Sequence, residues 1–244
     1  MKDEANVSEF VHKAFAYAYP AQAATETAAK QTVTELKRAL QLEQAAFEET
    51  YRATDTPYRE PKWKQSQQTG AERGTTLHLV FQLIDPSEPL DVQIDRWEAE
   101  SMLSPVEAET ARLASPEIKA FFASDTGRAL TAALQTGTGW RELPFTYTVP
   151  AERVNPTGTF TDEHVLIQGI IDCLFYDGET YVLLDYKSDS VLFSSGSRDA
   201  AKQMLRDRYH VQLSLYREAI EAIWGITVGQ MLIYSLELQE IVVL

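Results

Sequence analysis

The pattern of apolar and polar positions predicts helices in the first half of the chain. Between residues 74 and 85, apolar side chains recur every three or four positions, which is the spacing of a helix that buries one face. Residues 91–135 predict several short helices. Ser104-Pro105 and Ser115-Pro116 mark two starts, because a serine N-cap followed by proline suits the first helical turn. The pattern at residues 33–52 predicts one further helix.

The second half of the chain predicts strands interrupted by one long helix. The sequence TGTG at residues 136–139 is typical of a turn, and residues 199–224 predict a single helix. The other apolar runs have the length and composition of strands. The predicted strands are residues 140–149, 164–176, 180–187, 231–238 and 240–244. Helices, then a meander of strands, a helix and a final strand indicate an α/β or α+β domain.

Length and composition predict either one large domain or a core with an appendage. The chain has 244 residues, of which 44% are hydrophobic and 24% are charged. Residues 1–70 are rich in Ala, Glu, Gln and Thr, and include the stretch ATDTPYREPKWKQ, which has no clear period. We therefore predict a helical linker or arm at residues 1–70 and a single domain at residues 71–244.

Several classes of protein are excluded by simple features of the chain. No apolar run reaches the roughly 18 residues of a transmembrane helix, and the N-terminus lacks the pattern of a signal peptide. Cys173 is the only cysteine, which excludes an intrachain disulfide, a cysteine-ligated zinc site and an iron–sulfur cluster. These features fit a reducing cytoplasm.

The net charge of −14 argues against a protein that grips nucleic acid by itself, because phosphate contacts need lysine and arginine. One window differs from the rest of the chain. Residues 186–217 contain six basic and three acidic side chains, so this segment is locally positive. A charged helix face is usually solvated, and the window alone indicates no function.

The chain carries an unusual set of charges inside two apolar strands. The sequence GIIDCLFYDGETYVLLDYKSDS predicts two strands joined at Asp177-Gly178, a strong hairpin signal. A two-residue loop makes Asp172 and Asp185 diagonal neighbours on one face of the sheet, and Lys187 shares that face. A four-residue loop keeps this arrangement. A three-residue loop moves Asp172 to the other face.

Two buried carboxylates so close together need a positive partner. At a separation of about 4 Å they repel by roughly 4 kcal/mol for an effective dielectric constant near 20. Lys187 offsets part of this repulsion, and a divalent cation offsets more, since carboxylate ligands favour magnesium or manganese. The alternative is a buried Asp–Lys ion pair with the second aspartate bonded to the backbone.

Five motifs in order resemble the RecB-like branch of the PD-(D/E)xK nucleases. They are RGTTLH ending at His78, RELPF with Glu142, GIID with Asp172, DYK with Asp185 and Lys187, and QLSLY on a helix. The resemblance covers residues 73–244, and a weaker likeness extends back to about residue 29. It implies an α/β, restriction-endonuclease-like core with a central mixed sheet flanked by helices, plus an N-terminal helical segment.

The resemblance also implies a metal site. Asp172 and Asp185 are expected to be the central ligands of one or two Mg²⁺ or Mn²⁺ ions. His78 and the main-chain carbonyl of Tyr186 are expected to complete the coordination.

Four further residues receive roles from the same likeness. Lys187 is expected to position the attacking water or to stabilise charge on the phosphate, and Glu142 to lie near the metals. Gln212 and Tyr216, four residues apart on one helix face, are expected to orient Lys187 or to contact the DNA backbone.

The resemblance implies a magnesium-dependent deoxyribonuclease, an exonuclease that cuts unwound single strands during double-strand break repair and recombination. The expected partners are single-stranded DNA, the helicase portion of a longer parent chain, because this sequence has no GxxxxGK[ST] loop, and a second protein of the same complex. The expected location is the cytoplasm, at the nucleoid.

Two other hypotheses stay open. One is a non-catalytic module that keeps the nuclease fold as a docking surface in the same complex. The other is an unrelated hydrolase that uses the two carboxylates as acid and base, which leaves Lys187 and His78 without a role.

Overall fold

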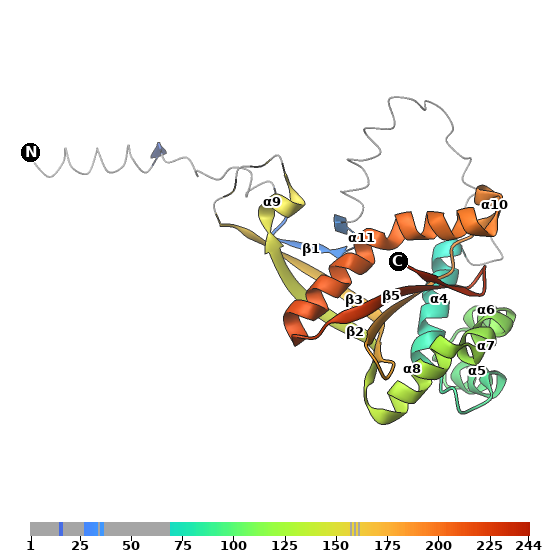
Figure 1. Ribbon diagram of the computed structural model, residues 1–244. Helices are drawn as coiled ribbons and strands as arrows, with labels where there is room; N and C mark the ends of the chain where they lie inside the picture. Colours follow the sequence, from blue (N-terminus) through green and yellow to red (C-terminus); the bar gives the residue numbers. More distant parts are fainter. Residues whose placement is uncertain are drawn as a thin grey trace, which may run out of the picture. The chain divides into compact units, whose positions relative to one another are not determined.

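The computed structural model describes residues 15–16, 27–33, 35–36, 69–156, 158, 160 and 162–244 (Figure 1). The chain divides into two compact units. The first comprises residues 1–32 and 147–167, and the second residues 33–146 and 168–244. Most of the predicted helix at residues 33–52, and most of the predicted arm, lie outside the described residues.

The first unit contains short elements and the ends of two long strands. The elements are β1 (Lys30–Thr32), α9 (Ala151–Val154), the end of β2 (Gly139–Pro150) and the start of β3 (His164–Tyr176). The predicted strand at residues 164–176 therefore has the bounds of β3, and the one at 140–149 corresponds to β2.

The second unit holds most of the helices and the rest of the sheet. The helices are α4 (Gly70–Leu83), α5 (Leu90–Ala99), α6 (Pro105–Leu113), α7 (Ser115–Ala123), α8 (Asp125–Thr136), α10 (Leu192–Ser195) and α11 (Arg198–Trp224). The strands confined to it are β4 (Tyr181–Lys187), β5 (Val228–Ser235) and β6 (Glu240–Val243). In the described part of the chain, no helix combines the length and apolar character that a membrane span requires.

The helix starts agree with the sequence at one serine and differ at the other. Ser104 caps α6, and its hydroxyl and the Glu107 carboxylate satisfy each other's backbone N–H groups, with Pro105 in the first turn. The prediction that Ser115 caps a helix is wrong. A single residue, Ala114, separates α6 from α7, so Ser115 is already helical and its hydroxyl lies 3.5 Å from the Ala111 carbonyl oxygen.

The strands form a mixed sheet, as predicted. Their order is β1-β3-β4-β5-β6, with β2 also paired to β3. β4 runs antiparallel to β3 and parallel to β5, and α11 makes the crossover that a parallel pair requires. Figure 1 shows α11 along one side of β5, with α4 and α8 on the other. The predicted α/β fold with helices flanking a central sheet is confirmed.

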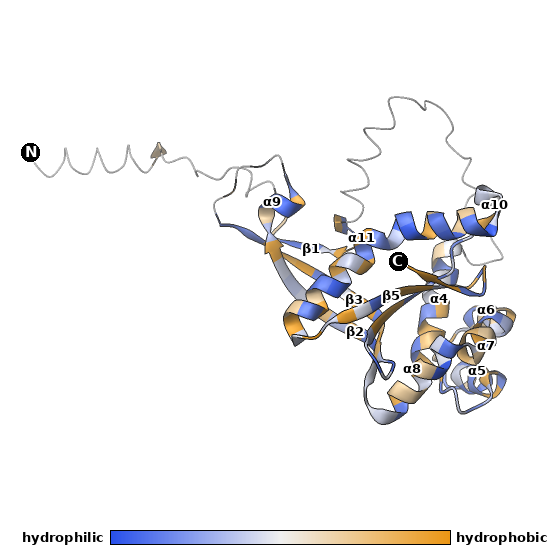
Figure 2. Cartoon of the chain, viewed as in Figure 1, coloured by the Kyte–Doolittle hydropathy of each residue, from blue (hydrophilic) through white to orange (hydrophobic). Residues whose placement is uncertain are grey.

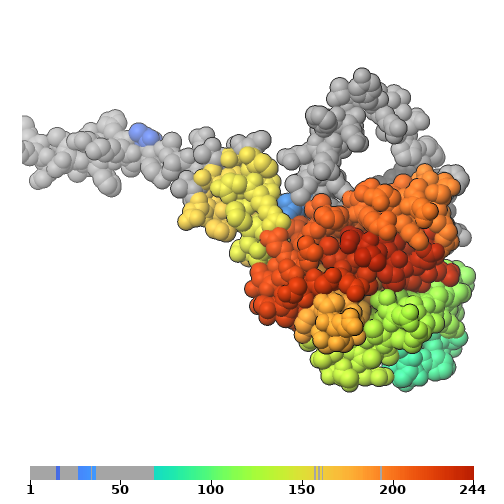
Figure 3. Space-filling model, in the orientation of Figure 1, coloured from blue at the N-terminus to red at the C-terminus, as the bar shows by residue number. Residues whose placement is uncertain are grey.

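Alternation along β4 separates two environments. Val182, Leu184 and Tyr186 belong to one apolar core with α4–α8, and the Tyr186 ring stacks on Phe81 with 3.8 Å between ring centroids. The opposite face, which carries Asp185, lies against α11. Figure 2 shows the apolar strands β5 and β6 beside the mostly hydrophilic outer surface of α11. In Figure 3, α11 and α8 lie at the surface of the second unit.

The hairpin between β3 and β4 has a four-residue loop, so the prediction of a two-residue loop is wrong. Tyr176 pairs with Tyr181, and Cys173 pairs with Leu184. The Asp177 carboxylate accepts the backbone N–H groups of residues 179 and 180 at 2.9 and 2.8 Å, which holds the wider turn. The register moves by two positions, and therefore every side chain keeps its predicted face.

Candidate active site

Two carboxylates lie side by side beneath α11. Asp172 on β3 and Asp185 on β4 are the positions next to the paired Cys173 and Leu184, so the register brings them opposite each other instead of diagonal. Both are buried, with 8% and 1% of their surface exposed. Burial, assisted by the charge of Asp172, raises the pKa of Asp185 in spite of a neighbouring lysine.

Lys187 balances part of this negative charge. Its Nζ atom lies 2.5 Å from Asp185 Oδ2, and its side chain is 12% exposed. Burial lowers the pKa of Lys187, but the charges of Asp185 and Asp172 outweigh that effect and raise the pKa above its usual range. Lys187 is therefore a fixed cation beside the two carboxylates.

His78 reaches the same place from α4. The apolar face of that helix buries Leu77 and Phe81, which leaves His78 at the edge of the stripe. Its Nδ1 atom lies 3.3 Å from Asp172 Oδ2. Burial lowers the pKa of His78, yet the hydrogen bond and charge of Asp172 outweigh burial and raise it. Asp172 Oδ2 also accepts the backbone N–H of Tyr186 at 2.8 Å.

Glu142 on β2 completes a three-residue cluster. One ligand atom each from His78, Glu142 and Asp172 lies within 4.8 Å of the others. Burial and the charge of Asp172 raise the pKa of Glu142. Its backbone has φ of 50°, a left-handed conformation that is uncommon for residues other than glycine. Such strain often occurs at functional sites, where it aims a side chain that an extended strand would direct elsewhere.

These residues fit a hard divalent cation. Imidazole nitrogen and carboxylate oxygens converge in one place, and Asp185 Oδ2 is buried without a hydrogen bond of good geometry, held only by the charge of Lys187. Asp185 stands beside the three-residue cluster, because its two oxygens face Lys187 and Gln212. The buried Cys173 thiol is engaged with the Tyr186 hydroxyl at 3.3 Å.

Gln212 and Tyr216 lie on the face of α11 that covers the carboxylates. The Gln212 side-chain amide donates to Asp185 Oδ1 at 3.3 Å and to the Tyr216 hydroxyl at 3.1 Å. Tyr216 is buried and packs edge-on against Phe145. The hydrogen bonds thus reach Asp185, and the predicted role of this pair in orienting Lys187 stays a prediction, as does the carbonyl ligand from Tyr186.

A glycine next to the site leaves space for these rings. A β-carbon at Gly169 would lie 2.6 Å from the Phe145 ring and 3.1 Å from the Tyr216 ring. We expect Gly169→Ala to lower the free energy of unfolding by about 1–3 kcal/mol through overpacking, measured by urea denaturation. Gly70→Ala is the matched control, since nothing lies within 4 Å of its added methyl group. Equal stability of the two variants would contradict this account.

Sequence reasoning left three residues out of the predicted site. The Tyr209 hydroxyl donates to Asp189 Oδ2 at 2.7 Å, and Arg208 Nη1 lies 2.5 Å from Asp189 Oδ1. The Tyr209 ring lies under Lys187, with 4.6 Å from Nζ to the ring centroid. A signal for Tyr209 exists in the sequence, because it precedes Gln212 by three positions and so shares its helix face.

The locally positive window serves largely to attach α11 to the last strand. Arg198 and Lys202 both form ion pairs with Glu240 on β6. Arg206 donates to the main-chain carbonyl of Val243 at 2.9 Å. These contacts favour a structural role for much of the window over a broad surface for nucleic acid.

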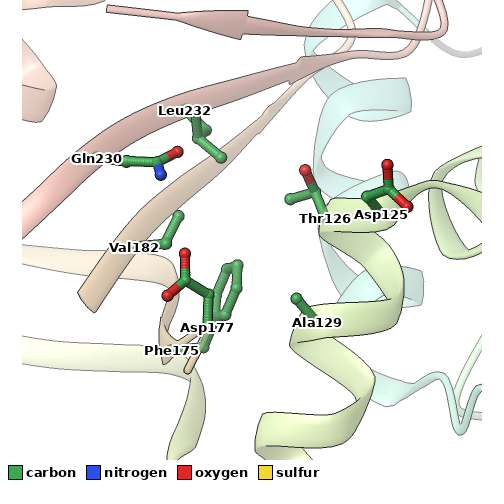
Figure 4. A pocket seen from close by; sticks show the side chains of 8 residues that line it. All are labelled: Asp125, Thr126, Ala129, Phe175, Asp177, Val182, Gln230 and Leu232. Carbon is green, nitrogen blue, oxygen red and sulfur yellow. The ribbon is translucent and has the colours of Figure 1, made fainter. Parts of the chain in front are cut away.

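One cavity of about 250 Å³ lies away from the charged cluster (Figure 4). Its walls come from the start of α8, the β3–β4 turn and the far ends of the strands. The lining residues are Asp125, Thr126, Ala129, Phe175, Asp177, Val182, Gln230 and Leu232. None of the predicted site residues lines it, so the cavity and the candidate active site are separate features.

A mixed sheet flanked by helices, with carboxylates, a lysine and a histidine gathered where β3 and β4 adjoin, defines the restriction-endonuclease-like class of α/β proteins. The chain belongs to the PD-(D/E)XK nuclease superfamily, whose family model matches residues 47–242. That match begins inside the predicted arm, and the boundary at residue 70 stays a prediction.

Three relatives are each described as one of the subunits of an ATP-dependent helicase/nuclease. The protein of Exiguobacterium sibiricum is 48% identical over 232 residues, which cover 95% of this chain and 19% of that protein. The protein of Geobacillus thermodenitrificans is 38% identical over 223 residues, covering 87% and 18%. The protein of Listeria monocytogenes is 32% identical over 233 residues, covering 92% and 18%. The chain therefore spans about a fifth of the length of these relatives.

Proposed function

We propose that this chain is the nuclease domain of a helicase–nuclease and that it hydrolyses phosphodiester bonds in unwound single-stranded DNA. The observation that supports this most is the meeting of His78, Glu142 and Asp172 within 4.8 Å, beside the ion pair of Asp185 and Lys187. The family supplies the reaction class, and the names of the relatives suggest the helicase context.

His78, Asp172 and Asp185 would hold Mg²⁺ or Mn²⁺, with Glu142 and the Tyr186 carbonyl as further oxygen donors. The bound ion supplies Lewis acidity and lowers the pKa of a coordinated water. The chain itself keeps these donors in place: Tyr186 N–H and His78 fix Asp172, while Gln212 and Lys187 fix Asp185.

Lys187 would act on the substrate. Its raised pKa keeps the ammonium group protonated, so at neutral pH it stabilises negative charge and donates hydrogen bonds. In this role Lys187 orients the attacking water or stabilises charge on the phosphate, and the products are expected to be a 5′-phosphate and a 3′-hydroxyl.

The proposed context is a recombination complex that repairs double-strand breaks in the cytoplasm, at the nucleoid. We infer two partners, the helicase portion of the parent chain and an AddB-type subunit. A motor that delivers the strand raises its local concentration at the site. That supply makes the net charge of −14 compatible with cutting DNA, and the isolated chain is expected to cut weakly, as an exonuclease on single strands.

The test uses labelled single-stranded DNA with the 244-residue chain. Cleavage is expected with Mg²⁺ or Mn²⁺ and is expected to disappear when EDTA removes the ion. Cleavage that persists in EDTA would refute a metal-dependent reaction. If neither this chain nor the complete helicase–nuclease cuts DNA, the non-catalytic docking module becomes the better interpretation.

Metal affinity is expected to rise with pH between about 6 and 8. The pKa of His78 is raised, so its proton stabilises the apo fold below about 6.5, and this stabilisation is lost as pH rises through the folded-state pKa. A metal must displace that proton, because Nδ1 faces Asp172. Calorimetry in two buffers of different ionisation enthalpy should show proton release on binding.

His164 provides the matched control for that measurement. It is an exposed histidine whose Nδ1 lies 3.0 Å from the Asp162 carbonyl oxygen. His164→Gln should leave the pH dependence of metal binding unchanged, whereas His78→Gln should weaken binding and reduce proton release. Affinity independent of pH in the unaltered chain would contradict the role assigned to His78.

A further inference from the structure

The Lys187 ammonium is held from two sides. Asp185 Oδ2 lies 2.5 Å from Nζ on one side, and the ring of Tyr209 lies on the other at 4.6 Å from Nζ to the centroid. A cation over an aromatic face gains most when both are withdrawn from water. Lys187 is only 12% exposed, and Tyr209 is buried, so this contact is of the stronger kind.

Tyr209 is fixed in its turn by a charged pair. Its hydroxyl donates to Asp189 Oδ2 at 2.7 Å, and Arg208 Nη1 lies 2.5 Å from the other oxygen of the same carboxylate. Asp189 follows β4 by two residues, while Tyr209 and Arg208 belong to α11. The contacts therefore form a closed loop that joins the end of β4 to α11 around the lysine.

We propose that Tyr209 is a positioning residue that holds the Lys187 ammonium beside the scissile phosphate, with Asp189 and Arg208 fixing the ring. This inference rests on the proposed nuclease function. It adds a role for residues outside the motifs from which that function was inferred.

Charge balance explains why such a holder is needed. In the apo arrangement Asp185 alone anchors Lys187 by charge, and a metal bound at Asp185 repels the ammonium and shares its partner. A lysine side chain has several rotatable bonds, so without a second contact it would swing toward Asp189 or solvent. The neutral ring keeps its attraction when the metal binds. Burial and the bond to Asp189 raise the pKa of Tyr209, which keeps it neutral.

Substitution of the ring tests the proposal with the 244-residue chain. Tyr209→Leu should lower kcat for single-stranded DNA about 10- to 30-fold, while KM and the affinity for Mn²⁺ change less than twofold. Tyr209→Phe keeps the ring and loses only the hydroxyl, so it should lower kcat about two- to fourfold. Tyr176→Leu is the matched control, since Tyr176 is partly exposed at the other end of β3, and its kcat should equal that of the unaltered chain.

The fixing role of Asp189 has its own test. Asp189→Asn and Tyr209→Phe remove the two ends of one hydrogen bond, so the double variant should be no slower than the slower single variant. Fully multiplicative effects would show that Asp189 acts independently of the ring and would overturn this part of the proposal.

A chemical readout separates this inference from the nuclease assignment. The rate at which an acetylating reagent labels Lys187, followed by peptide mass spectrometry, should rise at least tenfold in Tyr209→Leu and less in Tyr209→Phe. If the unaltered chain fails to cut DNA, the proposed function fails, and the labelling still reports whether the ring holds the lysine. Unchanged labelling, unchanged kcat, or a loss of Mn²⁺ affinity equal to the loss of kcat would each overturn the role of Tyr209.

Discussion

Asp185→Asn is expected to reduce metal-dependent DNA cleavage by at least about 1,000-fold, which corresponds to about 4 kcal/mol of lost transition-state stabilisation. The asparagine keeps the shape of the side chain and can still accept the hydrogen bond from Gln212. It removes the anionic ligand, and a hard divalent cation depends on that charge. The measurement is the initial rate on labelled single strands at saturating Mg²⁺, together with Mn²⁺ affinity by calorimetry.

The fold is expected to survive this substitution. Burial and Asp172 raise the pKa of Asp185, so ionised Asp185 weakens the apo protein, and a neutral replacement relieves the repulsion of Asp172. The lost ion pair with Lys187 acts in the opposite direction. Asp207→Asn on the exposed side of α11 is the matched control and should retain full activity. Activity retained in Asp185→Asn would refute the assignment of the metal site.

The local pattern of the chain predicted most elements, since burial periodicity and turn residues act over a few positions. The bounds of β3 and the long helix α11 followed from such patterns. The grouping of Asp185 and Lys187 also followed, because side chains two apart on a strand share a face. The hairpin loop did not follow. Its length depends on hydrogen bonds that Asp177 makes with the turn, and a dipeptide preference for two-residue loops does not include them.

The site contains features that only tertiary structure determines. The left-handed backbone of Glu142 has no signal in its sequence, because an extended conformation is the expectation for a glutamate in a strand. The contact between His78 and Asp172 joins a helix and a strand far apart in the chain, and the family resemblance suggested it where periodicity could not. Tyr209 lay within reach of helix-face reasoning, yet its contact with Lys187 depends on how α11 crosses β4.

Lys187→Met is expected to lower kcat by about 100- to 10,000-fold while the divalent metal still binds. The methionine side chain has similar length and fills the same buried space, but it carries no charge and donates no hydrogen bond. If Lys187 acts on the water or the phosphate, its loss removes stabilisation that exists mainly in the transition state. Removing a cation near the metal should leave Mn²⁺ affinity unchanged or increase it, because the repulsion between the two positive charges disappears.

This combination distinguishes a catalytic lysine from a structural one. If Lys187 served only to balance the charge of Asp185, Lys187→Met would instead lower the melting temperature of the apo chain, and bound metal would restore both stability and activity by replacing the lost charge. Lys119→Met is the matched control, because the Lys119 ion pair with Asp91 lies at the surface of α7. Cleavage near the level of that control at saturating Mg²⁺ would show that the buried lysine is a structural counter-ion, and Asp172 and Asp185 would then bind metal without help from an ammonium group.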